Sequence, residues 1–134
     1  FSAQKQLLER AKYKNPVAFL AGEYEPQRFF EAVKGLENCR EGGARCEKCF
    51  ELRLSKAAEI AKKGGFDYFA TTLTVSPHKN AVLINEIGGR YQNYLPSDFK
   101  KREGYKRSII LSKEYELYRQ GYCGCIFSKG ERDI

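Results

Sequence analysis

The chain has 134 residues and a net charge of +7, from 24 Lys and Arg against 17 Asp and Glu. This length suits one domain, and 42% hydrophobic residues supply a core for it. No apolar run approaches the roughly 20 residues that a membrane span needs, so we expect no transmembrane segment. The positive charge favours anionic partners, among them nucleic acids.

The sequence opens on Phe1, contains no methionine and shows no secretory signal pattern. We therefore expect a cytoplasmic protein and a chain that is a fragment of a longer one. Within residues 1–134 we expect a single α/β domain, with a cysteine-bearing C-terminal tail from about residue 119.

Apolar spacing predicts helices at 2–13, from Pro26 to Gly35, at about 45–63, from Ser76–Pro77 to Gly88, and at 107–118. The apolar run 17–21 and the aromatic and β-branched run 66–73 predict two strands. Residues 91–105 have the composition of a loop. Because helices and strands alternate, the pattern favours an α/β layer with a parallel sheet.

Four of the five cysteines form two close pairs, whereas Cys39 stands apart. Cys46 and Cys49 lie at the start of a predicted helix, where both thiols project from one face and the first turn favours thiolate. This pair suits a metal, a cluster or a redox dithiol. A disulfide between Cys123 and Cys125 would close a small, easily reduced ring, which suits a store of two electrons. A zinc site built from all four thiols is one alternative, and two thiols without a function in the tail are another.

Two segments could contact an anion. The run from Lys100 to Arg107 places five cations around Tyr105, which suits phosphate contacts and one stacking ring, or simply a solvated face. Residues 71–80 join a predicted strand end to a helix start, where Lys79 could hold an anion. His78, the only histidine, could donate a proton there or be an exposed first-turn residue.

Four blocks of sequence closely resemble one family. They are Glu41–Leu54 with its Cys46-x-x-Cys49, Phe66–Asn80 with Thr71-Thr72-Leu73 and Ser76-Pro77-His78-Lys79-Asn80, Tyr94–Lys100 with Leu95-Pro96 and Asp98-Phe99, and Tyr122-Cys123-Gly124-Cys125. Over about residues 24–128, the chain resembles the cobalamin-independent epoxyqueuosine reductases of the QueH type. Four blocks in the family's order make the resemblance highly specific.

The resemblance implies the last step of queuosine synthesis, in which the epoxide of epoxyqueuosine in tRNA is reduced to an alkene. It also implies a 4Fe–4S cluster, with an additional iron ion as a further option, and a redox-active pair at Cys123 and Cys125. Cys46 and Cys49 match two cluster ligands. The family's other two come from an adjacent Cys-Cys pair after a first strand, which this chain lacks. The fold class we expect is a Rossmann-like three-layer parallel sheet with flanking helices, incomplete at the N-terminus.

We therefore predict an oxidoreductase that acts on the anticodon stem-loop of tRNA, with an electron donor that the sequence does not identify. The predicted catalytic residues are Cys123 and Cys125, and the predicted metal ligands are Cys46 and Cys49. The predicted substrate-binding residues are Lys79, Lys100, Lys101, Arg102, Lys106 and Arg107. A zinc-binding, RNA-binding module without redox activity is the alternative function. A thioredoxin-like protein is less favoured, because its Cys-x-x-Cys should follow an early strand and not a glycine loop.

Overall fold

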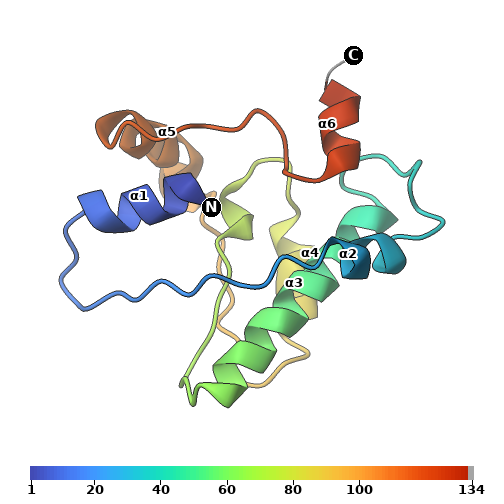
Figure 1. Cartoon of the computed structure of the whole chain (residues 1–134), viewed down its shortest axis with the longest axis horizontal. Coiled ribbons are helices and arrows are strands. Elements are labelled where there is room, and N and C mark those ends of the chain that lie inside the picture. The colour runs from blue at the N-terminus through green and yellow to red at the C-terminus, as the bar shows by residue number, and fades with distance from the viewer. Residues whose placement is uncertain (133–134) are drawn as a thin grey trace. The chain divides into compact units, whose positions relative to one another are not determined.

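The computed structural model describes residues 1–132, in which helices are joined by long loops (Figure 1). The helices are α1 (Ser2–Arg10), α2 (Pro26–Ala32), α3 (Ala44–Lys63), α4 (Ala81–Gly88), α5 (Gly104–Glu114) and α6 (Ile126–Arg132), with 3₁₀ turns η1 (Leu73–Val75) and η2 (Lys101–Glu103). The chain divides into two compact units. One consists of residues 25–105, and the other combines residues 1–24 with those from 106 onward. The arrangement of all residues as one domain stays a prediction.

The predicted Rossmann-like parallel sheet is wrong for the described residues, which are largely helical and form no sheet. Their parallel pairing is limited to one bridge between Phe69 and Tyr94. There the Phe69 N–H donates to Asn93 O at 3.1 Å, and the Leu95 N–H donates to Phe69 O at 2.8 Å. The run 66–73, predicted as a strand, therefore pairs at a single residue.

The second predicted strand, residues 17–21, is also absent, and Leu20 is 73% exposed. The physical reason is the same for both runs. Apolar and β-branched composition indicates that a segment fits a half-buried pleated surface, but it provides no neighbouring strand. A parallel sheet forms only where several such segments exchange backbone hydrogen bonds, and neither run has a row of strand partners among the described residues.

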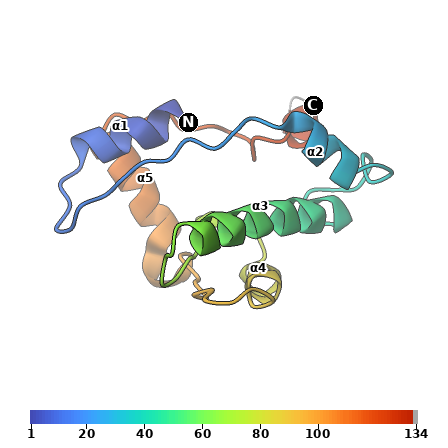
Figure 2. The same ribbon diagram turned by 60° about the horizontal axis from the view of Figure 1, so that its bottom comes forward.

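The core of unit 25–105 lies between α3 and α4, which pack side by side (Figure 1 and Figure 2). Phe50 and Leu54 of α3 meet Ile84 and Ile87 of α4, and all four side chains are buried. The i, i+4 spacing on α3 and the Leu83, Ile84 and Ile87 stripe on α4 produce these two faces. The predicted helix at about 45–63 is confirmed by α3.

The predicted start of α4 at Ser76–Pro77 is wrong. The helix begins at Ala81, after Asn80, whose Oδ1 accepts the Leu83 N–H at 3.1 Å as an N-cap. Ser76 Oγ instead accepts the His78 N–H at 3.3 Å, a local turn that competes with helix formation. Ser76 and Asn80 both favour the N-cap position, and Asn80 is the residue that occupies it.

A partly buried polar network fixes the loop that follows α4. Asn85 Oδ1 accepts both the Tyr94 hydroxyl at 2.6 Å and the Ser97 N–H at 3.2 Å, while Asn85 Nδ2 donates to Ser97 O at 2.9 Å. Thr74 of η1 is fully buried, and its Oγ1 accepts the Phe99 N–H at 3.2 Å. Burial raises the pKa of Tyr94. Residues 94–100 are thus held against η1 and α4.

In the other unit, Arg10 at the end of α1 holds the end of α5. Its Nη1 donates to Tyr115 O at 2.5 Å and to Glu116 O at 3.4 Å. Glu116 has a φ of 52° and ends the helix before the predicted boundary at residue 118. Helix α6 falls in the tail, which was not predicted to be helical. Through residue 132, no helix combines the length and apolar character that a membrane crossing requires.

Candidate functional site

Cys46 and Cys49 lie on the first two turns of α3 in unit 25–105. Gly42, with a φ of 90°, turns the chain into the helix, and Gly43 is the N-cap. Residues three apart on a helix are neighbours on one face. Both side chains are half-buried thiols, and neither forms a disulfide. This part of α3 therefore presents two sulfur atoms that a single metal centre could bind.

Each of these sulfur atoms accepts an N–H hydrogen bond. The Gly42 N–H donates to Cys46 Sγ at 3.2 Å, and Arg53 Nε donates to Cys49 Sγ at 3.3 Å. The first donor comes from the loop before the helix, and the second from the next turn of the helix itself. Donors of this kind orient a ligating sulfur and stabilise its negative charge.

Arg45 supports the loop that carries Gly42. Its side chain is 2% exposed, and its Nη1 donates to Glu37 O at 2.9 Å and also to Cys39 O. One guanidinium thereby ties residues 37–39 to the first turn of α3. Cys39 is half-buried and takes part through its backbone carbonyl.

The thiols of Cys46 and Cys49 fit an iron–sulfur cluster as a pair of ligands. Soft thiolates are the donors that such clusters take, and N–H···S bonds are a common feature of their surroundings. Among residues 1–132, however, no group of three His, Cys, Asp or Glu side chains could hold a metal ion. Cys46 and Cys49 would supply two of the four thiolates that a 4Fe–4S cluster takes.

Cys123 and Cys125 lie in the other unit, in the turn that leads into α6. Gly124 between them has a φ of 98°, a conformation that L residues rarely adopt. The Cys123 N–H donates to the buried Ser128 Oγ at 3.2 Å, and Cys125 O accepts the Lys129 N–H at 3.1 Å. Both side chains are half-buried thiols outside any disulfide. Backbone contacts to α6 thus hold two thiols that are two residues apart.

Two of the predicted substrate-binding lysines lie beside each other. Lys100 Nζ donates to Thr74 O and to Lys79 O, each at 2.8 Å, and lies 3.9 Å from the Asp98 carboxylate. Lys79 Nζ lies 5.7 Å from the centre of the ring of Phe50, the residue that follows Cys49 on α3. The Lys100 ammonium therefore joins η1 to the residue before the α4 cap, and Lys79 lies over the core near the thiol-bearing end of α3.

The other four predicted substrate-binding residues are exposed, namely Lys101, Arg102, Lys106 and Arg107. Lys101 and Arg102 lie in η2, where Arg102 has a φ of 55°. Lys106 and Arg107 lie on α5, in the other unit. His78 is also exposed, in the turn before α4.

The family model described as "Epoxyqueuosine reductase QueH" matches residues 1–131. The chain belongs to the QueH family. The resemblance expected from the four sequence blocks is thereby confirmed, and the match is longer than the 24–128 expected. A "QueH" relative from Streptococcus pyogenes serotype M1 is 50% identical over 88% of this chain and 48% of its own length.

Other curated members of the QueH family give the same result. A protein from Staphylococcus epidermidis named "Epoxyqueuosine reductase QueH" is 48% identical over 88% of this chain and 52% of its own length. One of the same name from Thermotoga maritima is 40% identical over 83% of this chain and 62% of its own length. The chain thus spans about half the length of the curated relatives it matches.

Sequence reasoning did not assign a role to Arg45 or Arg53. Both flank the Cys-x-x-Cys motif, and the helical period places Arg53 one turn after Cys49. That spacing could have indicated the Arg53 donor. No sequence signal showed that Arg45 is buried, because arginine is usually exposed.

Proposed function

We propose that this chain is part of an epoxyqueuosine reductase, which reduces the epoxide of epoxyqueuosine in tRNA in the last step of queuosine synthesis. Membership of the QueH family supports this proposal, since the curated relatives carry that enzyme's name. The observation that carries it is the Cys46–Cys49 pair on α3, in which each sulfur accepts an N–H hydrogen bond.

Cys46 and Cys49 are assigned to the metal centre. A 4Fe–4S cluster, with or without an additional iron ion, would supply one-electron transfer and a Lewis-acidic metal when bound. The Gly42 amide and the Arg53 guanidinium hold the two sulfur atoms in place. Arg45 keeps the loop of Gly42 attached to the helix.

Cys123 and Cys125 are assigned to the supply of electrons. Reduction breaks the two C–O bonds of the epoxide, releases the oxygen as water and leaves an alkene, which consumes two electrons and two protons. Formation of one S–S bond from two thiols releases the same two electrons and two protons. The two cysteines are two residues apart and flank the turn at Gly124. An external reductant, such as a dithiol, then restores both thiols for the next turnover.

The tRNA substrate is assigned to the basic residues. Exposed lysines and arginines contact phosphates, and Lys101, Arg102, Lys106 and Arg107 are all exposed. The anticodon stem-loop carries the wobble nucleotide that is modified, so this is the part of tRNA that we propose to dock. We propose a cytoplasmic location to match this substrate.

Metal analysis after anaerobic purification and reconstitution tests the assignment of Cys46 and Cys49. The test uses the full-length protein that contains this chain, here called the parent. We expect iron and acid-labile sulfide in the parent and in Cys39→Ser, the matched control. Cys46→Ser and Cys49→Ser should lose most of both. A protein that binds zinc but no iron would contradict the reductase and favour the RNA-binding alternative.

Turnover assays test the assignment of Cys123 and Cys125. In the full-length protein, we expect Cys123→Ser to keep the iron content of the parent and to lose multiple turnover. Cys39→Ser should keep both. Unchanged turnover in Cys123→Ser would remove this cysteine from the reaction.

A further inference from the structure

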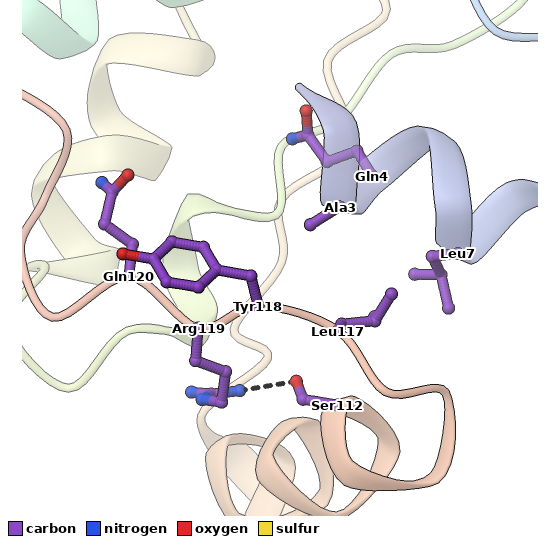
Figure 3. A pocket seen from close by; sticks show the side chains of 8 residues that line it. All are labelled: Ala3, Gln4, Leu7, Ser112, Leu117, Tyr118, Arg119 and Gln120. Atoms are coloured by element: carbon purple, nitrogen blue, oxygen red, sulfur yellow. Dashed lines mark hydrogen bonds between the residues drawn. The ribbon is translucent and has the colours of Figure 1, made fainter.

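A pocket of about 270 Å³ lies between α1 and the turn that follows α5, entirely within one unit (Figure 3). Its half-buried walls include Leu7 of α1 and Leu117 after α5. Three consecutive exposed side chains, Tyr118, Arg119 and Gln120, stand around it on one side. On the α1 side, Gln4 contributes a second amide. None of these residues belongs to the cysteine pairs or to the predicted basic run.

The rim carries an aromatic ring and side-chain amides, which can stack on and hydrogen-bond to a flat heterocyclic ring. Tyr118 is 76% exposed, so both its face and its hydroxyl are accessible. Gln120 Nε2 donates to Tyr122 O at 2.9 Å, which fixes an amide whose oxygen can accept an N–H from a ligand. Figure 3 shows Tyr118 among the residues that line the pocket, with Gln4 on the α1 side and Gln120 on the side toward which the tyrosine ring extends.

A cation lies next to this ring. Arg119 Nη1 donates to Ser112 Oγ at 2.9 Å, so this exposed guanidinium is directed toward α5. An arginine guanidinium has five donors and can keep this bond while it contacts a phosphate. The unit as a whole has ten Lys and Arg against six Asp and Glu, which favours an anionic ligand.

Hydrogen bonds join the two walls of the pocket, α1 and the turn after α5. Arg10 of α1 donates to the carbonyls of Tyr115 and Glu116, directly before Leu117. The Leu117 N–H donates to Ser112 O at 2.8 Å, which fixes the turn to α5. The pocket is slightly smaller than the roughly 300 Å³ at which sites for drug-sized ligands begin, and so matches a single nucleobase or nucleoside.

We propose that this pocket binds one unpaired nucleobase of RNA. The base stacks on Tyr118, and its hydrogen-bonding edge contacts the side-chain amides of Gln4 and Gln120. The phosphate of the same nucleotide lies near Arg119. The inference rests on the proposed function for its choice of RNA. Stacking on an exposed aromatic ring is how single-stranded nucleic acids are commonly bound.

The chain contains no tryptophan, which gives a direct test. Tyr118→Trp introduces a single fluorescent indole at the rim, and Tyr24→Trp introduces one at a 91% exposed position of the same unit as a control. The probes are an RNA stem-loop, the same stem-loop with abasic loop positions, and a blunt RNA duplex. We expect the stem-loop to quench the indole emission of Tyr118→Trp, and the abasic loop and the duplex to quench it little. The emission of Tyr24→Trp should change little with any of the three.

Affinity measurements separate this proposal from the function on which it rests. Tyr118→Ala should weaken binding of the stem-loop roughly 5- to 150-fold, the range for one stacked base, whereas Tyr24→Ala should not. Stem-loop binding that is equal in the parent and Tyr118→Ala overturns the pocket and leaves the proposed tRNA substrate intact. Absence of stem-loop binding in the parent overturns both. Equal quenching by duplex and stem-loop also overturns the pocket, because a paired base cannot enter it.

Discussion

Replacement of Arg45 by methionine should destabilise the unit that carries Cys46 and Cys49. The change removes two hydrogen bonds from a charged donor to Glu37 O and Cys39 O, each worth about 1.5–3 kcal/mol. Water can reach the exposed Glu37 segment and replace part of that loss. Methionine also fills most of the buried volume. We therefore expect the free energy of unfolding to fall by about 2–4 kcal/mol.

Urea denaturation followed by circular dichroism measures this change, with Arg40→Met as the control. Arg40 lies in the same loop, carries the same charge and is exposed, so its loss should change the free energy by less than about 0.5 kcal/mol. Mass spectrometry after brief alkylation should show faster labelling of Cys46 in Arg45→Met, because the Gly42 donor loses its support. Equal stability of Arg45→Met and Arg40→Met would refute the role given to this buried arginine.

Three further substitutions test other contacts of the same unit. Arg53→Met should weaken iron retention by about 10- to 100-fold, because Cys49 Sγ loses its N–H donor. Lys56→Met on the same helix should leave iron retention unchanged. Equal iron content in the two variants would contradict the Cys49 contact. Lys100→Met should lower the free energy of unfolding by about 1–2 kcal/mol, because the carbonyls of Thr74 and Lys79 lose the partly exposed ammonium that donates to them. Lys101 is exposed, so Lys101→Met should weaken only RNA binding. Tyr94→Phe should cost about 0.5–1 kcal/mol at neutral pH, because Asn85 Oδ1 keeps the Ser97 donor. Burial raises the pKa of Tyr94 in the folded state, so its contribution is complete below about pH 10 and falls as the pH rises further; Tyr94→Phe should remove that part of the alkaline loss in a pH series of urea denaturations.

Helices could be predicted from this sequence because their signals are local. The Phe50 and Leu54 stripe defines α3, and its Gly42–Gly43 start follows from neighbouring residues. Whether the strand-like segments pair into a sheet could not be predicted in the same way, since strand pairing depends on segments far apart in the chain. Residues 66–73 have strand-like composition but a partner at Phe69 alone.

The candidate site follows the same division. The spacing of Cys46 and Cys49 was enough to place both thiols at the start of one helix. The role of Lys100 could not be predicted, because it depends on carbonyls of residues 74 and 79 that only the folded loop brings near. Lys100 belongs to a basic run in the sequence, but in the structure its ammonium stabilises the loop by hydrogen bonds.

The coupling of product formation to oxidation of Cys123 and Cys125 tests the central claim most directly. The full-length protein that contains this chain is reduced, reconstituted with iron and sulfide, freed of external reductant and mixed with epoxyqueuosine-containing tRNA without oxygen. Remaining thiols are then alkylated and the protein is digested with trypsin, which releases both cysteines in one peptide, residues 120–129. We predict that one disulfide forms in this peptide for each queuosine produced. Queuosine that accumulates while Cys123 and Cys125 stay fully alkylatable would contradict the account.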